Sequence, residues 1–326
     1  MKTGRMMSAV LNTAILWLAV SHAGAQEFPS KVIKITSPYS AGSGPDVIAR
    51  AVAEKMSKAW GQQAIVDARP GGNGFIALEA VKRAPADGHE LAIVGNAHMT
   101  INPALFRKLP YDPKADFAPV AMLYSTPFFI AVSANGPYRT MADLIADAKA
   151  NPGKISYGSP YIGSPSHLGS ALLESLTDTK MIHAPFKDAL QIFTSIANGD
   201  VGWALGTLGT AGALVRAGKI KLIAVAAKKR LPSHPDIPTV DEATGLKGFD
   251  VDAWVALMAP RRTPAAVVQR INAEVNKILD QPDVKDRMTA LGFVPAPDTP
   301  DGLAQTIDRD LKKYGELVKR TGASAE

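Results

Sequence analysis

The chain has 326 residues, of which 46% are hydrophobic, and it contains no cysteine. A chain without cysteine has no disulfide, thiolate metal site or cysteine nucleophile, so its stability must come from a sizeable hydrophobic core. The formal charge of +6 is mild and no block of Lys or Arg is present, which excludes a typical nucleic-acid-binding surface and slightly favours anionic ligands.

The first 25 residues match the pattern of a secretory signal peptide. Lys2 and Arg5 form a basic start, an apolar run follows over 6–20, and the small residues Ala-Gly-Ala at 23–25 resemble a cleavage site. The apolar run is short for a membrane span, and no later stretch is longer. We therefore expect cleavage near Ala25 and an exported protein located in the periplasm.

Strand-like and helix-like segments alternate along the rest of the chain, which predicts α/β layers around largely parallel sheets. The segment 46–60 is typical of the helices, because its apolar residues recur at 3.6-residue spacing along one face. Thr263-Pro264 and Thr299-Pro300 mark two further helix starts, with threonine as cap and proline as first residue. Strands are predicted over 32–35, 64–66, 91–94, 120–123, 128–132, 155–157, 181–183, 201–205, 222–226 and 254–258, and helices over 46–60, 75–84, 140–150, 165–177, 188–198, 208–217, 264–280 and 300–321.

Two changes in composition divide the chain into two lobes. The residues 124–127 join two predicted strands, and a polar, proline-rich stretch occupies 228–238. Two crossings of this kind would leave the middle of the chain as one lobe and bring its ends together in the other. We expect residues 26–124 and 229–326 to form lobe 1 and residues 125–228 to form lobe 2.

The stretch 37–46 (Ser-Pro-Tyr-Ser-Ala-Gly-Ser-Gly-Pro-Asp) lies between the first predicted strand and the first helix. Its small residues allow backbone N–H groups to converge at a helix start, where unpaired donors and the helix dipole favour an anion. Ser43 and Asp46 have the S-x-x-D spacing of a capping box. The stretch predicts an anion site, and leaves open whether the anion is a phosphate held for chemistry or a carboxylate that is only bound.

Patterns for nucleotide and metal sites are incomplete. Residues 72–77 (Gly-Asn-Gly-Phe-Ile-Ala) fit the dinucleotide pattern, but Arg-Pro at 69–70 separates them from the preceding strand and no acidic residue follows at the expected distance. Gly-Ser-Gly at 42–44 lacks the lysine of a P-loop, and the six histidines are scattered. We expect no cofactor, no metal ion and no catalytic constellation.

Ser164-Pro-Ser-His167 leaves an exported serine hydrolase as an alternative. Hydroxyl groups lie beside a histidine here, but neighbours in sequence are rarely a catalytic pair and no orienting acid is indicated. The other interpretation is that the serines cap the helix that begins near Pro165, with His167 packed against the sheet. A hydrolase predicts turnover of an ester or amide, whereas a binding protein predicts a stoichiometric ligand.

Small hydrogen-bond donors gather in the loops that follow several predicted strands. Ligands of open α/β sheets bind outside the carboxyl ends of the strands, where helix N-termini point. Loops of this kind on two lobes would form a cleft that offers N–H and hydroxyl groups from both sides, which suits a small carboxylate. These loops are 39–44, 69–74, 95–100, 158–166, 185–188 and 206–209.

Many short motifs follow one another along the chain: PYSAG (38–42), DVIAR (46–50), RPG (69–71), ADG (86–88), INPAL (101–105), LPYDP (109–113), DFAPV (116–120), SHL (166–168), HAPFK (183–187), AGK (217–219), PTVDE (238–242) and Pro264. In this order they resemble the periplasmic solute receptors of the tripartite tricarboxylate transporter system, the Bug-type or TctC-like family. The resemblance covers nearly all of the chain after the expected signal peptide. It implies a two-lobed, type II periplasmic-binding-protein fold that closes on its ligand, with each lobe a mixed sheet flanked by helices.

The resemblance also implies the function and the binding residues. Family members bind small organic acids, mainly through loop N–H groups and waters, and deliver them to a membrane permease, so no catalytic activity is expected. We expect a monomer, and a sensory receptor with the same fold and ligand class stays open as an alternative. The binding residues carried over are Tyr39, Ser40, Ala41, Gly42, Ser43, Asn96 and Ala97 in lobe 1, and Ser159, Gly163, Ser164, His167, Phe186, Lys187 and Thr207 in lobe 2.

Departures from the family pattern bear on the ligand. Gly206 stands where the family often has an aspartate that could pair with an ammonium group, and Trp203 lies three residues upstream. Phe75 and Tyr161 replace a common asparagine and a common glycine, and both are added to the expected binding set. The loss of an acid and the gain of aromatic rings favour an aromatic mono- or dicarboxylate over an amino acid. Lys187 or Arg69 would add a positive charge if either reaches the cleft.

Overall fold

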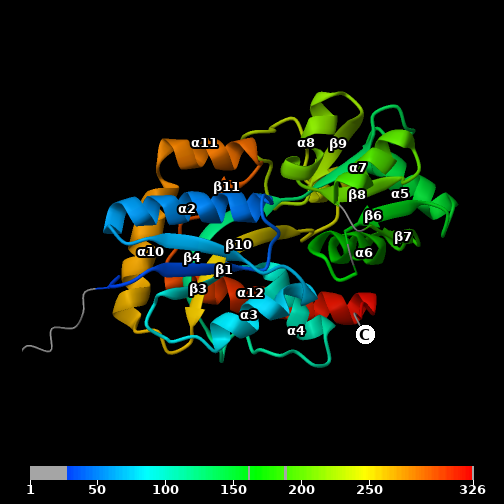
Figure 1. The fold of residues 1–326 in the computed structure, drawn as a ribbon. Helices are drawn as coiled ribbons and strands as arrows, with labels where there is room; N and C mark the ends of the chain where they lie inside the picture. Colours follow the sequence, from blue (N-terminus) through cyan, green and yellow to red (C-terminus); the bar gives the residue numbers. More distant parts are fainter. Residues whose placement is uncertain (1–27, 161, 187–188, 325–326) are drawn as a thin grey trace, which may run out of the picture.

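Two mixed β-sheets, each flanked by helices, organise the chain (Figure 1). The computed structural model describes residues 28–160, 162–186 and 189–324. The expected signal peptide and the expected binding residues Tyr161 and Lys187 lie outside these ranges. No helix within the described ranges is long and apolar enough to span a bilayer.

Lobe 1 contains a six-stranded sheet in the order β11-β4-β10-β3-β1-β2. β1 is parallel to β2 and β3, whereas β10 is antiparallel to both β3 and β4, so the sheet is mixed. The strands are β1 Ile33–Ser37, β2 Ala64–Ala68, β3 Glu90–Gly95, β4 Phe117–Pro127, β10 Asp252–Pro260 and β11 Val294–Pro295. The helices are α2 Gly44–Trp60, η1 Gly72–Gly74, α3 Phe75–Lys82, η2 Ala97–Ile101, α4 Asn102–Leu105, α10 Ala265–Leu279, α11 Pro282–Ala290 and α12 Pro300–Thr321.

Lobe 2 contains a five-stranded sheet in the order β7-β6-β8-β5-β9. β6 is parallel to β7 and β8, and β5 is antiparallel to β8 and β9. The strands are β5 Phe129–Ser133, β6 Ser156–Ser159, β7 Ile182–Pro185, β8 Trp203–Gly206 and β9 Ile220–Val225. The helices are α5 Met141–Ala150, α6 Pro165–Thr177, α7 Ala189–Asn198, α8 Leu208–Arg216 and α9 Val240–Thr244.

The chain crosses between the lobes later than its composition suggested. β4 continues to Pro127 in the first sheet and β5 begins at Phe129 in the second, so the first crossing lies just after the expected position. The return crossing is displaced further, because Val240 and Val251 are buried in the core of lobe 2. The Val225 N–H also donates to the Pro238 carbonyl, 2.9 Å away. The return therefore lies at 251–252, and the proline-rich stretch that suggested residue 229 belongs to lobe 2.

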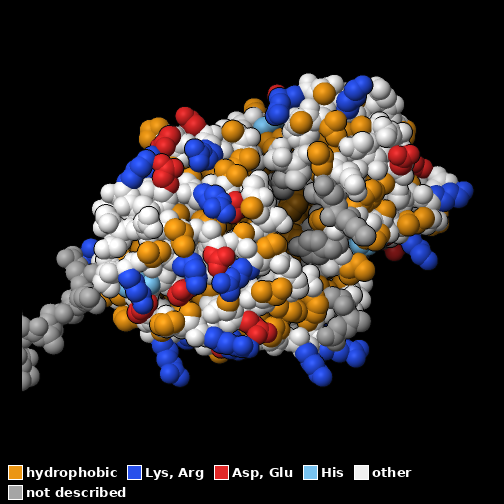
Figure 2. All heavy atoms as spheres, in the orientation of Figure 1, with side chains coloured by type: hydrophobic (Ala, Val, Ile, Leu, Met, Phe, Trp, Pro, Cys, Tyr) orange, Lys and Arg blue, Asp and Glu red, His pale blue; other side chains and the backbone are white. Residues whose placement is uncertain are grey.

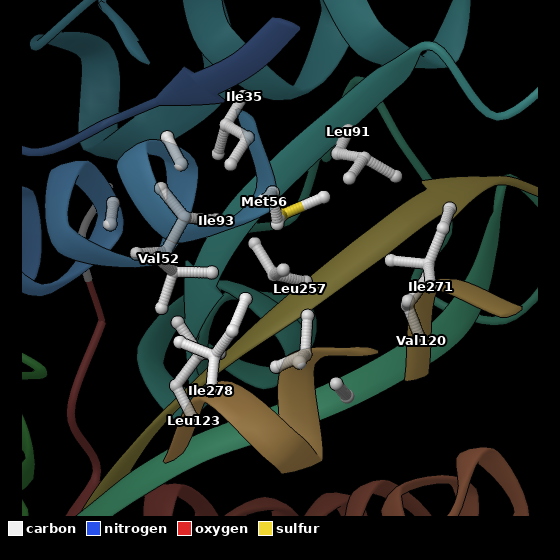
Figure 3. Close-up of a cluster of buried hydrophobic side chains, with 14 of the residues drawn as sticks. Ile35, Val52, Met56, Leu91, Ile93, Val120, Leu123, Leu257, Ile271 and Ile278 are labelled. Carbon is white, nitrogen blue, oxygen red and sulfur yellow. The ribbon is translucent and has the colours of Figure 1, made fainter. Parts of the chain in front are cut away.

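The core of lobe 1 is packed on both faces of its sheet. Figure 3 shows Val52 and Met56 of α2, Ile271 of α10 and Leu257 of β10 pointing into one shared cluster. α3 and α12 cover the opposite face, where Leu78 and Leu303 are fully buried. A strand covered on both faces needs consecutive apolar residues, and β3 supplies them in its Leu-Ala-Ile-Val run.

The C-terminal helix α12 connects the two lobes. It packs against the first sheet, and Figure 1 shows its C-terminal end lying beside α6 of lobe 2. An apolar cluster joins Leu317 and Val318 of α12 to Leu168 of α6 and to Leu105 of α4. The lobes therefore meet through side chains as well as through the crossing strands.

Candidate ligand-binding site

A cavity of about 690 Å³ lies between the lobes, at the carboxyl ends of the parallel strands. Lobe 1 contributes most of its lining, including Tyr39, Ser43 and Phe293, and lobe 2 contributes Pro165 and Thr207. Figure 2 shows the hollow on one face of the molecule, with hydrophobic side chains inside it. A concave, mostly apolar site with a few polar groups at the junction of two lobes is the usual setting for a small-molecule ligand.

Three helices begin at this cavity. Gly44 and Pro45 at the start of α2, Pro165 at the start of α6, and Gly209 in the first turn of α8 all line it. The N-terminus of each helix carries unpaired N–H donors and a partial positive charge. Three such ends facing one cavity create a site that favours an anion.

No described residue that lines the cavity carries a charged side chain. The polar groups are hydroxyls, amides and one imidazole, among them Ser40, Ser43, Asn73, Thr207 and Thr210. A bound anion would therefore be stabilised by N–H dipoles and hydroxyl donors rather than by a salt bridge. Arg69, which could have added a charge, pairs instead with Asp67, its Nε lying 2.8 Å from the carboxylate.

Aromatic rings form the walls between these polar groups. The rings of Tyr124 and Phe293 stack with centroids 4.1 Å apart and an angle of 6° between their planes. Tyr39 packs edge-on against His98, and its hydroxyl occupies the space where a side chain at position 95 would project. Gly95 is therefore required for Tyr39 to reach this position.

The structure brings six of the expected binding residues into the cavity lining. They come from the loop after β1, from the loop after β3 and from the N-cap of α8. These residues are Tyr39, Ser40, Ser43, Asn96, Ala97 and Thr207.

Three expected lobe 1 residues do not line the cavity. The Gly42 N–H donates to the Asp46 carboxylate over 2.9 Å, so it is not available to a ligand, and Ala41 beside it is exposed. Phe75 packs edge-on against Phe106 at 5.1 Å and against Tyr111 at 6.0 Å. Phe75 is therefore part of the packing of lobe 1 rather than a wall of the cavity.

The N-terminus of α2 does not form the capping box that its sequence predicted. Ser43 is the N-cap of α2, but its side chain makes no capping hydrogen bond. Asp46 instead accepts from the Gly42 N–H and from Arg50, whose Nε lies 2.9 Å away. Burial raises the pKa of the Asp46 carboxyl, but the hydrogen bonds from Arg50 and Gly42 outweigh it and hold the pKa below its ordinary value. Asp46 thus fixes the loop without using the Ser43 hydroxyl.

Apart from Thr207, the expected binding residues of lobe 2 that the structure describes make contacts within that lobe and do not line the cavity. Ser159 Oγ lies 2.7 Å from His183 Nε2, and the rings of His183 and His167 stack with centroids 4.1 Å apart. The Gly163 N–H donates to His167 Nδ1 over 3.0 Å, and the Ser164 hydroxyl caps α6. Phe186 packs against the apolar cluster around α7.

These contacts bear on the hydrolase alternative. The nitrogen His167 Nδ1 is already occupied by the Gly163 N–H, and the Ser164 and Ser166 hydroxyls lie 3.2 Å from each other. Within the part of the chain that the structure describes, no serine hydroxyl bonds to the His167 ring and no group of three His, Asp or Glu residues could hold a metal ion. Ser164 caps a helix and His167 packs beside the sheet.

Several residues that line the cavity were not among the predicted binding residues. Tyr124 and Thr126 lie in β4, His98 in η2, and Phe128 at the crossing. Phe293 reaches the site from the loop after α11. His98 falls within the expected donor loop 95–100, and Tyr124 and Thr126 fall within 124–127, which was expected to join the lobes, whereas no sequence pattern pointed to Phe293.

Two buried histidines should make the protein less stable in mild acid. Burial lowers the pKa of His98 and of His167 to about 4, the second with help from His183. In the unfolded chain both have a pKa near 6.5, so between about pH 6.5 and pH 4 the unfolded state binds more protons and stability falls as the pH falls. Each histidine should lower the free energy of unfolding by roughly 3 kcal/mol across this window, with no further change from these groups below it.

The measurement is urea unfolding at pH 7 and at pH 4.5, on the wild type and on His98→Asn. The asparagine amide oxygen can replace Nδ1 as acceptor for the Gly95 N–H, which His98 accepts over 3.0 Å. The variant should lose less stability on acidification than the wild type, because only the histidine titrates. Equal losses in the two proteins would contradict the expected contribution of His98.

Comparison with known proteins decides the family. The model of the family described as "Tripartite tricarboxylate transporter family receptor", TctC, matches residues 48–323. The chain belongs to this family. A UPF0065 protein of Bordetella bronchiseptica is 33% identical to it over 316 residues, which cover 97% of this chain and 93% of the relative. BugT of Bordetella pertussis is 26% identical over 95% of this chain and 97% of its own length.

Solved structures confirm the fold that the resemblance to TctC receptors implied. Rpa4515 of R. palustris, solved with adipate, matches with a TM-score of 0.81 at 28% identity, over 91% of this chain and 99% of that one. MatC of Rhodopseudomonas palustris, solved with bound malate, matches with a TM-score of 0.77 at 31% identity, over 89% and 100% of the two chains. The TctC family consists of solute-binding receptors, and the two-lobed, mixed α/β architecture of this chain is theirs.

Proposed function

We propose that this protein is a periplasmic receptor that binds a small carboxylate between its lobes and delivers it, as a monomer, to the membrane subunits of a tripartite tricarboxylate-type transporter. One observation carries the proposal: the starts of α2, α6 and α8 face a cavity whose described lining has no charged side chain. Oriented N–H dipoles stabilise a carboxylate without a counter-ion. The adipate in Rpa4515 and the malate in MatC are both small carboxylates, which supports the same class here.

An aromatic or otherwise apolar acid fits the walls of the cavity. Two of the residues that first suggested this, Phe75 and Trp203, are packed inside the lobes and do not line it. The preference now rests on Tyr39, Phe128 and Phe293, which do. A flat or apolar ligand body buries its surface against these rings, and the missing acidic group excludes a counter-charge for an ammonium among the described lining residues.

Thermal shift and calorimetry on the purified protein test the ligand class. We expect adipate, benzoate or terephthalate to raise the melting temperature by several degrees, because a ligand at 100 times its Kd adds about 2.7 kcal/mol to the stability of the folded form. Glucose and putrescine, which carry no carboxylate, serve as controls and should give no shift. Mass spectrometry of molecules released on denaturation should identify a carboxylic acid.

A shift with the controls and none with any carboxylate would contradict the receptor proposal. Turnover of p-nitrophenyl esters that disappears in Ser164→Ala or Ser166→Ala would support a hydrolase instead. We expect no such turnover, since the Ser164 hydroxyl caps α6 and His167 Nδ1 accepts from Gly163. Export is tested separately, by N-terminal sequencing of the protein recovered from the periplasm, which should begin near Gln26.

A further inference from the structure

We propose that Asn96, which the family resemblance assigns to the ligand, instead anchors the hinge between the lobes together with Tyr314 and Lys313 of α12. The three residues are then positioning residues: they hold the hinge in place and set the affinity for the ligand without donating a hydrogen bond to it. The inference rests on the proposed function as a receptor that closes on a carboxylate, and it gives the C-terminal helix a part in that function. We call the three residues the hinge anchor.

The two strands that cross between the lobes change lobe at matched positions. In the first crossing, Pro127 ends β4 in the first sheet, and the Phe128 carbonyl accepts from the Ala226 N–H of lobe 2 over 2.8 Å. In the return crossing, the Val251 N–H donates to the carbonyl of the same Ala226 over 3.2 Å, and Asp252 pairs with Pro127 in the first sheet. Bending is therefore confined to one peptide link in each strand, between 127 and 128 and between 251 and 252.

The lobe 1 side of the return crossing is fixed at the Asp252 carbonyl oxygen. This oxygen accepts from Asn96 Nδ2 and from the Tyr314 hydroxyl, each over 3.0 Å. The Tyr314 hydroxyl also accepts from Asn96 Nδ2 over 3.2 Å, so the three groups form a closed triangle. Asn96 is 2% exposed and Tyr314 is fully buried, and hydrogen bonds shielded from water in this way are stronger than exposed ones.

Both amide protons of Asn96 are used in this triangle. A carbonyl oxygen can only accept, so the Asp252 carbonyl requires the NH2 group of Asn96, rather than its oxygen, on that side. One proton of the NH2 group is donated to Asp252 and the other to Tyr314. Asn96 borders the cavity, but its side chain has no proton left for a carboxylate. It connects the wall of the cavity to the hinge.

Lys313 adds a link across the return crossing. Its Nζ lies 3.9 Å from the Asp250 carboxylate, on the lobe 2 side, and 3.6 Å from the Asp252 carboxylate, on the lobe 1 side. Asp250 also lies 3.6 Å from Lys228 Nζ. These distances are long and the Lys313 side chain is 25% exposed, so its contribution is smaller than that of the buried triangle.

An anchored hinge reduces the entropy that is lost when the lobes close. The open form samples more conformations when more residues at the hinge are free, and a ligand must then order them on closing. Loss of the anchor frees the start of β10 and so favours the open form. A ligand shifts this equilibrium only by its contacts in the closed form, so its affinity falls.

The first test needs no ligand. The chain contains no cysteine, so one introduced cysteine in each lobe carries a spin label specifically, and Asp286 on α11 and Ala213 on α8 are both exposed. Double electron–electron resonance measures the distance between labels at Asp286→Cys and Ala213→Cys. In Tyr314→Phe this distance should become longer and more broadly distributed than in the labelled protein with Tyr314. The phenyl ring keeps the packing of Tyr314 and removes only its hydroxyl.

Calorimetry with adipate as the probe measures the consequence for binding. Tyr314→Phe should weaken adipate binding about fivefold, as expected when one buried hydrogen bond that favours closure is lost. Tyr138→Phe is the matched control, because the Tyr138 hydroxyl donates to Asp147 over 2.7 Å within lobe 2 and Tyr138 does not line the cavity. The control should lower the melting temperature and leave the label distance and the Kd unchanged. A residue that only supports the fold would behave like this control.

Two comparisons separate the members of the hinge anchor. Lys313→Met should weaken adipate binding about twofold, whereas Lys312→Met, at an exposed position on the same helix, should leave it unchanged. Asn96→Ala and Tyr314→Phe together should weaken binding by less than the product of their separate effects. The reason is that the two side chains share one hydrogen bond and one acceptor.

If Tyr314→Phe leaves either the label distance or the Kd of adipate as in wild type, the inference is wrong and the receptor function stands. Effects that multiply in the double variant would mean that Asn96 acts on the ligand by itself, which would overturn its place in the hinge anchor. If no carboxylate binds to the wild type, the proposed function fails, while the label distances still decide whether the hinge anchor holds the lobes.

Discussion

Replacing Gly209 by alanine should weaken binding of the proposed carboxylate ligand, with adipate as the probe, by at least about tenfold without destabilising the fold. Gly209 lies in the first turn of α8 in lobe 2, and a Cβ there would come within 2.5 Å of the Leu291 carbonyl oxygen of lobe 1. A backbone carbonyl cannot move aside as a flexible side chain can. The methyl group would therefore act as a wedge that holds the lobes apart, and a ligand shifts this balance only by its contacts in the closed form.

Stability should change in the opposite direction, because alanine is preferred to glycine inside a helix by up to about 1 kcal/mol. Calorimetry gives the affinity, and small-angle scattering with adipate should show that the variant stays more open than wild type. Gly212→Ala is the matched control in the same helix, since its Cβ would meet only the flexible end of Arg216, at 3.3 Å. An unchanged Kd in Gly209→Ala would show that binding does not need this inter-lobe contact.

Asp310→Ala should lower the free energy of unfolding by about 3 kcal/mol. The Asp310 side chain is fully buried on α12, where it accepts from the Trp254 indole N–H over 2.8 Å and from Arg309 Nε over 2.9 Å. The alanine leaves the buried indole N–H without its partner. Urea unfolding followed by circular dichroism measures the loss, which should be smaller in Asp310→Asn, because the amide oxygen can still accept from Trp254.

Asp308→Ala on the same helix is the comparison for that loss. Asp308 is half exposed and pairs with Lys114 at 2.7 Å, and an exposed ion pair of this kind contributes little. Its removal should change stability by no more than about 0.5 kcal/mol. If Asp310→Ala lowers the free energy of unfolding as little as Asp308→Ala does, the buried hydrogen bond to Trp254 contributes nothing measurable and α12 is stabilised by its apolar contacts alone.

The elements of the fold could be predicted from the sequence where a pattern is long and regular. The helix at α2 shows a continuous apolar stripe and a proline at its start, and β3 a run of four apolar residues, so both were expected close to their bounds. The short elements α4, α9 and β11 carry too few residues for a period and were missed. The return crossing was predicted at the wrong position because it was placed at a proline-rich loop. The composition of a loop does not indicate which lobe the residues on either side of it pack against.

The site could be predicted only in part, for a similar reason. Tyr39, Ser43 and Thr207 follow strands and precede helices, so local sequence points to them. Tyr124 and His98 line one cavity only because β10, far along the chain, pairs with both β3 and β4. Small polar residues in a loop also do not reveal whether their donors are already used, as the N–H groups of Gly42 and Gly163 are.

The position of β10 in the middle of the first sheet has a consequence for the order in which the chain can fold. Lobe 2 is one continuous segment, so all of its strands are available as soon as residue 251 has been made or has crossed a membrane. Lobe 1 cannot complete its sheet until β10 arrives, because β3 and β4 have no direct pairing without it. The two segments of lobe 1 are also separated along the chain by the whole of lobe 2. Contacts between residues so far apart in sequence form slowly. The cavity between the lobes, which needs both of them, is thus the last part of the molecule to form.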